Sequence, residues 1–366
     1  MIRVCHLTSV HDENDTRIFL KECVSLSRNG YEVFFVVAGA QSHVVDWVNI
    51  VGVKKIGNRL MRIVRAWRPV YEAAVAIDAQ IYHIHDPELL KAAVRLRLRG
   101  KTVVYDSHED LPRQILAKPW IPSGLRPLLS RVVERVENAR ARKMSAIVTA
   151  TPHIKERFEQ LLPSDRVCAV GNFPILDEIK PRDNWDSRPV AACYIGGIFR
   201  ERGIEEMVCA AGNANIPLLL AGTFAPPSLL GEMQRLDGWK NVDYRGFLDR
   251  RQVDELLADS MMGLLLLHPL PSYKDSLPIK LFEYMAAGIP VVCSDFPLWR
   301  GIVEDCHCGL CVDPLDAKAV ASAVRQLASD RELAHLMGQR GRAAVENKYS
   351  WKSQEKILLD LYATLL

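Results

Sequence analysis

The chain has 366 residues, 49% of them apolar and 25% charged, which is typical of a soluble globular protein long enough for two domains. It contains no uncharged apolar run of about 18 residues, so no membrane-spanning helix is expected. The nine scattered cysteines are an odd number without a secretory signal, which favours reduced thiols in the cytosol. Residues 1–180 hold 27 Lys and Arg against 20 Asp and Glu, a net charge of +7, whereas the remainder has −4. We therefore expect the first half to face an anionic partner.

In the first half, short apolar segments alternate with amphipathic helical ones. Strands are predicted at residues 2–7, 32–38, 50–56, 80–85, 101–106 and 146–150, and a helix at residues 17–28 that ends at Gly30. The apolar runs lack a clean alternation, as expected of parallel strands that are covered on both faces. Alternating strands and helices predict a doubly wound α/β domain.

A loop rich in Pro, Asp and Asn, residues 173–188, is the predicted domain boundary. A second α/β series follows, with strands predicted at residues 190–195, 217–221, 242–244, 262–267, 290–293 and 310–312, and a final amphipathic helix at residues 351–366. The sequence thus predicts two Rossmann-like domains with a cleft between them.

The most informative segment of the second half begins at Asp275 and ends at the Gly-Ile-Pro break before the strand at residue 290. It places two carboxylates, Asp275 and Glu283, on either side of a loop-to-helix junction near Pro278. A helix N-terminus binds anions through its free N–H groups and its dipole, and the carboxylates could accept hydrogen bonds from sugar hydroxyls. Lys280 lies in the first helical turn, where a cation opposes the dipole, which favours a nearby anion. The segment therefore predicts a nucleotide-sugar site.

Glycines follow the strands of this second series. Gly196 and Gly197 come directly after the first strand, where backbone can approach a phosphate closely, and Arg200 and Arg202 follow them. Ligands of open α/β sheets bind beyond the carboxyl ends of the strands. Two further segments occupy such ends and are predicted to flank the nucleobase, namely Gly222 and Arg245-Gly246-Phe247.

Four pieces of the chain together resemble the retaining GT-B glycosyltransferases of family 4 (group 1). They are the Asp275–Glu283 block, the segment Tyr194-Ile-Gly-Gly-Ile-Phe-Arg-Glu-Arg-Gly203, the pair of segments at residues 81–86 and 105–110, and Tyr349-Ser-Trp351. The resemblance implies an α/β GT-B fold whose two doubly wound domains face a cleft. Residues 1–172 with a returning helix at 350–366 would form the acceptor-side domain, 173–188 the linker, and 189–349 the nucleotide-sugar domain.

The resemblance also implies roles for individual residues. Glu283 would bind the donor's ribose hydroxyls and Asp275 the transferred sugar, while Ser276, Leu277 and Lys280 would meet the phosphates. Asp275 stands where the family usually has Glu. Gly197 stands where it usually has Arg, so Arg200 and Arg202 are expected to take over the diphosphate, which the guanidinium of Arg202 can bind bidentately.

In the first domain, His108 follows a predicted strand and is expected to reach the cleft. The resemblance implies that it contacts the transferred sugar or positions the acceptor, so the predicted catalytic residues are His108, Asp275 and Glu283. The predicted acceptor side also contains Asp106 and Glu109, and from the first loop Asp12, Asp15 and Arg17.

No metal or other cofactor is expected, because the nucleotide sugar is itself a substrate. His83 and His85 are expected to face opposite sides of their strand, which argues against one shared metal. Cys306-His-Cys-Gly-Leu-Cys311 lacks a second ligand pair at zinc-site spacing.

Two basic segments, residues 54–68 and 118–131, interleave Lys and Arg with aromatic and apolar residues. This pattern favours contact with an anionic lipid surface, and the alternative is a pair of packed amphipathic helices. We expect a cytoplasmic protein at the inner face of the membrane. Nucleic-acid binding is not expected, because no such module is present.

These features predict a transferase that moves a sugar from a nucleotide donor to a hydroxyl of a glycan or lipid-linked oligosaccharide, and the resemblance implies that the reaction is retaining. A UDP-sugar is favoured over GDP-mannose, and the family's common setting indicates bacterial surface polysaccharide or lipopolysaccharide assembly. Two alternatives remain open at this stage: a nucleotide-sugar 2-epimerase on the same fold, and a non-catalytic nucleotide-sugar binder.

Overall fold

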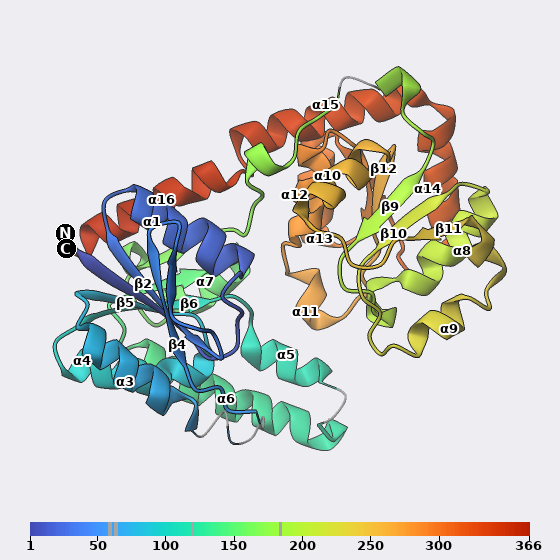
Figure 1. Cartoon of the computed structure of the whole chain (residues 1–366). Coiled ribbons are helices and arrows are strands. Elements are labelled where there is room, and N and C mark those ends of the chain that lie inside the picture. Colours follow the sequence, from blue (N-terminus) through green and yellow to red (C-terminus); the bar gives the residue numbers. More distant parts are fainter. Residues whose placement is uncertain (58–60, 62–64, 119–120, 183–184) are drawn as a thin grey trace. The chain divides into compact units, whose positions relative to one another are not determined.

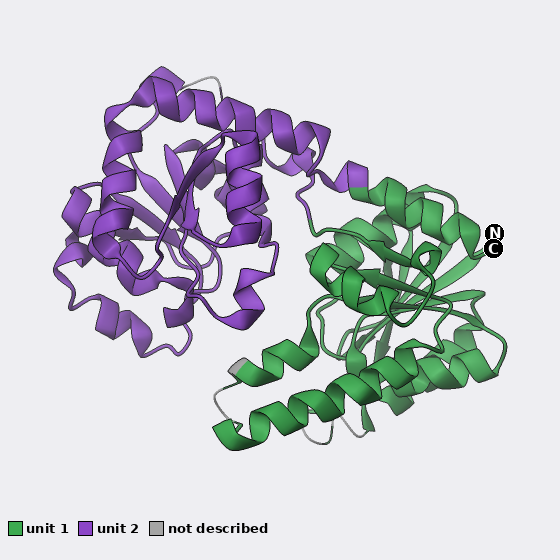
Figure 2. Cartoon of the chain, turned by 180° about the vertical axis from the view of Figure 1, so that it is seen from behind, with its two compact units in different colours: residues 1–172, 354–366 green, residues 173–353 purple. Residues whose placement is uncertain are grey.

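The computed structural model describes residues 1–57, 61, 65–118, 121–182 and 185–366. The chain divides into two compact units (Figure 2). Unit 1 comprises Met1–Asn172 and Gln354–Leu366, and unit 2 comprises Phe173–Ser353. The C-terminal segment therefore returns to the unit in which the chain begins, and both chain ends belong to unit 1 (Figure 1).

Unit 1 is built on a sheet with the strand order β3-β4-β2-β1-β5-β6-β7-β8, in which every neighbouring pair is parallel except β3 and β4. The strands are β1 (Arg3–Thr8), β2 (Glu32–Ala38), β3 (His43–Val45), β4 (Val48–Val53), β5 (Ile81–Ile84), β6 (Thr102–Ser107), β7 (Ala146–Thr149) and β8 (Val167–Ala169). The helices are the π-helix η1 (Thr16–Cys23), α1 (Val24–Arg28), α3 (Trp67–Ile77), α4 (Leu90–Leu98), α5 (Leu111–Ala117), α6 (Arg126–Ala141), α7 (Pro152–Glu159) and α16 (Trp351–Thr364).

The first half differs from the sequence prediction in two local ways. The short edge strands β3 and β8 were not predicted, because each has only three residues and pairs along a single edge. The predicted helix at residues 17–28 is two consecutive helices, the π-helix η1 and then α1. Asp15 caps η1 by accepting hydrogen bonds from the backbone N–H groups of Arg17 and Ile18, both at 2.9 Å.

Unit 2 has an all-parallel sheet with the order β11-β10-β9-β12-β13-β14, the 3-2-1-4-5-6 arrangement of a Rossmann fold. The strands are β9 (Ala192–Ile195), β10 (Leu218–Ala221), β11 (Val242–Tyr244), β12 (Met262–Leu265), β13 (Val291–Ser294) and β14 (Gly309–Val312). The helices are α8 (Ile204–Ala214), α9 (Leu229–Met233), α10 (Arg250–Ala258), α11 (Pro271–Lys274), α12 (Ile279–Ala286), α13 (Pro297–Cys306), α14 (Ala317–Ser329) and α15 (Arg331–Asn347). The doubly wound prediction is confirmed for both units.

The segment at residues 173–188 belongs to unit 2 rather than standing apart from it. Phe173, Ile179 and Trp185 are buried within the hydrophobic core of unit 2. The ring of Phe173 lies 4.6 Å from that of Phe282 on α12, and Trp185 donates its indole N–H to the Arg331 carbonyl. The Pro, Asp and Asn residues of this segment are typical of a linker, but its aromatic side chains anchor it in the core of unit 2.

The basic segments are only partly covered by the structure. Within 54–68 and 118–131, residues 58–60, 62–64 and 119–120 lie outside the described residues. Trp67, predicted as part of an interfacial surface, is instead buried at 7% exposure, with Lys91 and Arg95 over its ring. In the described parts of the chain, no helix combines the length and the apolarity that a membrane crossing requires.

Candidate functional site

Three glycines predicted to bind the donor lie together at the carboxyl edge of the unit 2 sheet. Gly196, Gly222 and Gly246 follow the adjacent strands β9, β10 and β11, and all three have positive φ. The Gly222 N–H donates to the Gly246 carbonyl at 2.7 Å, and Tyr244 donates its hydroxyl to the Gly222 carbonyl at 2.9 Å. The backbone segments that follow these three strands are therefore packed closely against one another. They lie beside the switch point between β9 and β12, where the strand order reverses and where Rossmann folds bind ligands.

Gly222 tolerates no side chain, which gives a direct test of this edge. A Cβ on Gly222 would lie 1.8 Å from the Gly196 carbonyl oxygen, and its φ of +138° already disfavours other residues. We expect Gly222→Ala to cost roughly 2–3 kcal/mol in free energy of unfolding, measured by urea denaturation, and to weaken nucleotide binding. The matched control is Gly231→Ala, whose Cβ meets nothing within 4 Å and which should change stability by less than about 1 kcal/mol. Equal stabilities of the two variants would contradict this account of the edge.

The side chain of Lys280 lies against the glycine edge. It lies in the first turn of α12, and a Cβ on Gly196 would meet Lys280 Cε at 2.2 Å and Nζ at 2.5 Å. Its ammonium forms no hydrogen bond or ion pair with any of the described residues. Burial lowers the pKa of Lys280, and the charges of Arg202 and Arg250 lower it further, although Glu283 opposes them. A half-buried cation beside glycine backbone, which carries no side chains, is the arrangement that an anion-binding site requires.

Glu283 lies on the same helix, and its ionic partner was not predicted. Arg250, at the start of α10, approaches the Glu283 carboxylate at 3.2 Å and the Glu178 carboxylate at 3.1 Å. The sequence marks the start of α10 through the capping box of Asp249 and Gln252, but it does not indicate that Arg250 reaches across to α12. Arg202, Lys280, Arg250 and Glu283 thus form one charged group at the switch point.

The other residues predicted to bind the nucleotide-sugar donor do not all lie at the glycine edge. Arg202 donates to the Gly197 carbonyl at 3.2 Å and faces the edge, whereas Arg200 is exposed and paired with Glu205 and Glu232. The expectation that Arg200 replaces the missing family Arg therefore has no support in this geometry. Phe247 follows Gly246 and is 83% exposed.

The loop before α12 also differs in part from its prediction. The Ser276 N–H was predicted to meet phosphate, but it donates to the Tyr273 carbonyl at 3.1 Å. Asp275 ends α11 with an exposed side chain, and Leu277 is half-buried beside it. The roles of Asp275 and Leu277 stay predictions.

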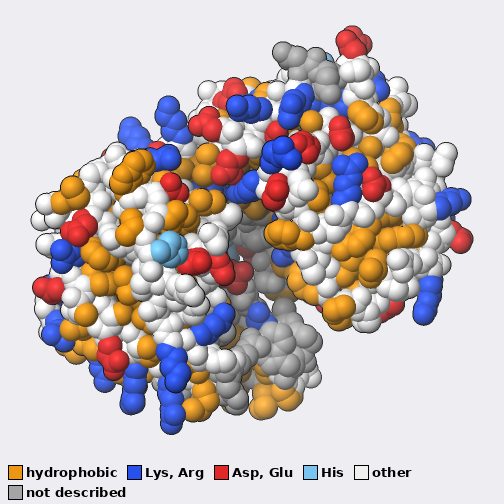
Figure 3. All heavy atoms as spheres, in the orientation of Figure 1, with side chains coloured by type: hydrophobic (Ala, Val, Ile, Leu, Met, Phe, Trp, Pro, Cys, Tyr) orange, Lys and Arg blue, Asp and Glu red, His pale blue; other side chains and the backbone are white. Residues whose placement is uncertain are grey.

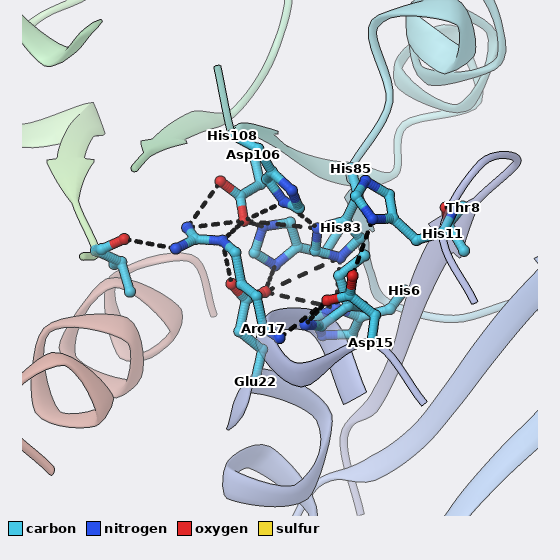
Figure 4. A network of polar contacts seen from close by, with 12 residues as sticks. His6, Thr8, His11, Asp15, Arg17, Glu22, His83, His85, Asp106 and His108 are labelled. Carbon is cyan, nitrogen blue, oxygen red and sulfur yellow. Dashed lines mark hydrogen bonds and ion pairs between the residues drawn. The ribbon is translucent and has the colours of Figure 1, made fainter. Parts of the chain in front are cut away.

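A buried polar network occupies the switch point of unit 1, between β1 and β5 (Figure 4). At its centre Arg17 from η1 forms a bidentate ion pair with Asp106 from β6, with nitrogen–oxygen distances of 3.0 to 3.1 Å. Arg17 also donates to the Val170 carbonyl at 2.8 Å. The charge of Arg17 holds the pKa of Asp106 well below its usual range, although burial alone would raise it. Two residues predicted on the acceptor side are thus buried against each other.

Four histidines extend this network. The His108 Nε2 lies 3.1 Å from Asp106 Oδ2 and 3.1 Å from His85 Nδ1. The His85 Nε2 in turn lies 2.9 Å from His6 Nδ1, and the His83 Nδ1 lies 2.8 Å from the Tyr362 hydroxyl. Burial lowers the pKa values of His6 and His83 well below the usual range and that of His85 to about 4, so these imidazoles are neutral at pH 7.

The expectation that His83 and His85 face opposite sides is wrong. Their rings stack with centroids 4.8 Å apart, since residues two apart on a strand share a face. The strand register pairs His6 directly with His83, which brings the third ring to the same place. Glu22 from η1 completes this buried group, and burial, together with the charge of Asp106, raises the pKa of its carboxyl well above the usual range.

The remaining predicted acceptor residues lie at the margin of this network or outside it. Asp15 caps η1 and contacts His11 Nδ1 at 3.0 Å. Asp12 holds a local turn with Asn14, and Glu109 is exposed and bonded to Gln114. The members that were not predicted, His6, Glu22 and Tyr362, come from β1, η1 and α16, and only the strand positions of His6 and His83 could have indicated a shared face.

The cysteine segment at residues 306–311 is not gathered into a metal site within the described chain. The groups of His, Cys, Asp and Glu close enough to hold an ion, among the described residues, are both in unit 1. The Cys311 sulfur instead lies 3.7 Å from that of Cys293 on the neighbouring strand.

Two family profiles cover consecutive parts of the chain. Residues 18–174 match the profile described as Glycosyltransferase Family 4, and residues 176–344 match Glycosyl transferases group 1. The capsular polysaccharide biosynthesis glycosyltransferase CapM of Staphylococcus aureus is 24% identical over 178 residues, which are 47% of this chain and 46% of CapM. The matched region thus spans about half the length of this curated relative.

Solved structures show the same fold over the whole chain. The sucrose-phosphate synthase of Thermosynechococcus elongatus has a TM-score of 0.79 at 16% identity and covers 100% of this chain and 99% of its own. Anabaena HepE, in complex with UDP-glucose, has a TM-score of 0.75 at 13% identity and covers 100% of both chains. At these identities the likeness concerns the fold, which is GT-B. Taken with the two profiles, it places this chain in the group 1 glycosyltransferases of the family 4 type.

Proposed function

We propose that this protein is a retaining glycosyltransferase that transfers a sugar from a nucleotide sugar to a hydroxyl of a glycan or lipid-linked oligosaccharide. The observation that carries the proposal is the charged group of Arg202, Lys280, Arg250 and Glu283 beside the bare backbone of Gly196. Cations and open backbone suit a diphosphate, and a carboxylate on the next helical turn suits ribose hydroxyls. CapM supports a role in surface polysaccharide synthesis.

A UDP-sugar is the favoured donor over GDP-mannose. HepE has the same fold and is described in complex with UDP-glucose, which supports this choice by analogy. The exposed ring of Phe247 beside Gly246 offers an apolar face on which a base can stack.

The chemistry follows from where charge develops. As the bond between sugar and phosphate breaks, negative charge grows on the departing diphosphate, and Lys280 and Arg202 are held where they can stabilise it. In a retaining reaction of this family the departing phosphate itself helps to accept the proton of the acceptor hydroxyl. No metal is needed at the donor site in this scheme. His108 would position the acceptor from unit 1.

Lys280 should make the affinity for the donor depend on pH. Its pKa is lowered in the free protein, and a bound diphosphate would raise it by favouring the charged form. Donor affinity should therefore be complete below the pKa of free Lys280 and should fall as the pH rises through it. Isothermal titration of nucleotide binding between pH 7 and 10 measures this. Lys280→Arg, which stays charged, should show a flatter profile, and identical profiles would contradict the assignment.

An exposed apolar stripe on α6 supports contact of unit 1 with an anionic membrane. Leu128 is 63% exposed, and the stripe continues through Leu129, Val132 and Val136 on α6 and Leu125 just before it, with Arg131 and Arg135 exposed beside it. Lys and Arg side chains are also prominent over the part of unit 1 that carries α3 and α4 (Figures 1 and 3). Apolar residues flanked by cations are the pattern of an interfacial helix.

Vesicle flotation tests this membrane contact. We expect wild-type protein to float with vesicles that contain phosphatidylglycerol and not with neutral ones, and Leu128→Glu with Val132→Glu to reduce the bound fraction at least about 5-fold. Leu98→Glu, at the end of α4 and 82% exposed, is the control and should bind normally. Equal flotation of all three proteins would refute the proposal for α6.

A thermal-shift screen of UDP- and GDP-sugars, followed by a transfer assay with the best ligand, tests the activity itself. A ligand that binds the native state raises Tm, and its sugar should then appear on a lipid-linked acceptor with its anomeric configuration kept. Incubation without acceptor is the second arm: an epimerised donor would indicate an isomerase, and binding without any turnover would indicate a non-catalytic binder.

A further inference from the structure

The buried histidines of unit 1 form a cluster that the proposed sugar transfer does not use. His6 on β1, His83 on β5, His85 directly after β5, and Glu22 on η1 are each at most 2% exposed. One donor atom of each lies within 4.8 Å of the donor atoms of the other three. Three imidazoles and a carboxylate are therefore gathered in one place in the interior of unit 1 (Figure 4).

The separations of these donor atoms fit a tetrahedral ion. Glu22 Oε2 lies 3.9 Å from His6 Nδ1, 4.0 Å from His83 Nδ1 and 3.9 Å from His85 Nε2, and the two nitrogens of His6 and His85 are 2.9 Å apart. Metal–ligand bonds of about 2.0 Å place tetrahedral ligands about 3.3 Å from one another. The donor atoms now lie up to 4.8 Å apart, so closing the group around an ion would bring the most distant pair together by up to about 1.5 Å, and His83 Nδ1 would exchange its contact to the Tyr362 hydroxyl for the ion.

The cluster also contains buried polar atoms that the protein leaves unsatisfied. Neither oxygen of Glu22 accepts a hydrogen bond from the described residues, although Arg17 Nε lies 3.2 Å from Oε1, and the His83 Nε2 also has no hydrogen-bond partner there. Arg17 partly compensates Oε1, whereas Oε2 lies 3.9 to 4.0 Å from ring nitrogens of the three histidines and has no such partner, and a buried oxygen left in this way is costly. Glu22 enters the cluster from the π-helix η1, and π-helical turns are frequent at functional sites.

The surroundings resemble the outer shell of a metal site. If His85 binds through Nε2, its Nδ1 faces His108 at 3.1 Å and Asp106 Oδ2 at 3.5 Å. If His6 binds through Nδ1, its Nε2–H can donate to the Tyr362 hydroxyl, which lies 3.4 Å away. Metal-ligating histidines typically donate their second ring nitrogen in this way, which fixes the ring and the tautomer.

We infer that His6, Glu22, His83 and His85 form a closed structural site for one zinc-type divalent cation. Four protein ligands leave no open position, and the site is buried, so the ion would hold β1, β5 and η1 together rather than take part in sugar transfer. Through the contact of His6 Nε2 with the Tyr362 hydroxyl it would also support the docking of α16 on unit 1. This inference departs from the sequence-based expectation of no metal, which rested partly on the wrong facing of His83 and His85.

The experiment uses the untagged full chain, expressed with zinc in the medium and desalted. We expect about one zinc per chain by elemental analysis, and a Tm that falls by at least about 5 °C after a strong chelator removes the ion. Substitution by Co²⁺ should give the intense visible absorption of a tetrahedral site. Glu22→Gln and His83→Gln should retain less than about a fifth of the metal, while His153→Gln, an exposed histidine on α7, should retain all of it.

The wild-type measurements decide the question even if a buried variant fails to fold. Less than about a tenth of an equivalent of zinc in the wild type, with no Tm change on chelation, would overturn the inference and leave the cluster as a hydrogen-bonded network. A weakly absorbing octahedral Co²⁺ spectrum, or full metal content in both folded ligand variants, would overturn it by placing the ion elsewhere.

Discussion

Replacing Glu283 by alanine should lower kcat/KM for the donor by about 10³-fold, or about 4 kcal/mol, because two charge-assisted hydrogen bonds to ribose hydroxyls would be lost. The fold should persist. Among the described residues Glu283 is paired with Arg250, whose side chain is 41% exposed, and such a pair contributes less than about 1 kcal/mol to stability. Initial rates of nucleotide release at several donor concentrations, together with a thermal melt, measure both effects.

The matched control for Glu283 is Glu255 on α10. It is an exposed helical glutamate whose ion pair, among the described residues, is with Arg251 at 3.7 Å, one turn away. Glu255→Ala should therefore leave both rate and Tm unchanged. If Glu283→Ala kept its rate within about 3-fold of wild type, Glu283 would be no more than a structural partner of Arg250.

Removing the guanidinium of Arg17 should destabilise unit 1 by about 3–5 kcal/mol, because Asp106 would keep a buried charge without its partner. Arg17 is 4% exposed and Asp106 is fully buried. The loss corresponds to a fall of roughly 10 °C in the Tm of unit 1. Differential scanning calorimetry of Arg17→Met should show this shift in one transition and leave the unit 2 transition in place.

Arg28→Ala is the control for Arg17→Met. Arg28 ends α1 with an exposed side chain, and its removal should cost less than about 0.5 kcal/mol. If Arg17→Met lowered the free energy of unfolding by less than about 1 kcal/mol, the ion pair would not stabilise unit 1. The predicted role of Arg17 on the acceptor side would then be favoured again.

The glycine edge of unit 2 could be predicted because its signals are local. Gly196, Gly222 and Gly246 each follow a strand, and parallel strands bring their carboxyl ends to one edge whatever the rest of the chain does. The helix that begins at Ile279 was marked by Pro278 before it. Arg250 could not be predicted in this way, because its approach to Glu283 depends on the packing of α10 beside α12.

The unit 1 network could not be predicted to the same extent. His6, Glu22 and Tyr362 are far apart in the sequence, and only the docking of η1 and α16 on the sheet brings them together. The spacing of His83 and His85 places their side chains on the same face of the strand, so the expectation that they face opposite sides was an avoidable error. Arg17 and Asp106 were identified as polar residues near strand ends, but the sequence does not indicate that their charges are buried against each other.

The central claim is that the edge formed by Gly196, Lys280 and Glu283 binds the donor's diphosphate and ribose. The most direct measurement is a crystal structure with UDP, or with whichever nucleotide raises Tm most. The account predicts diphosphate oxygens within hydrogen-bond distance of Lys280 and Arg202, and ribose hydroxyls on the Glu283 carboxylate. A nucleotide that is bound elsewhere, with Lys280 and Glu283 free of it, would contradict the claim.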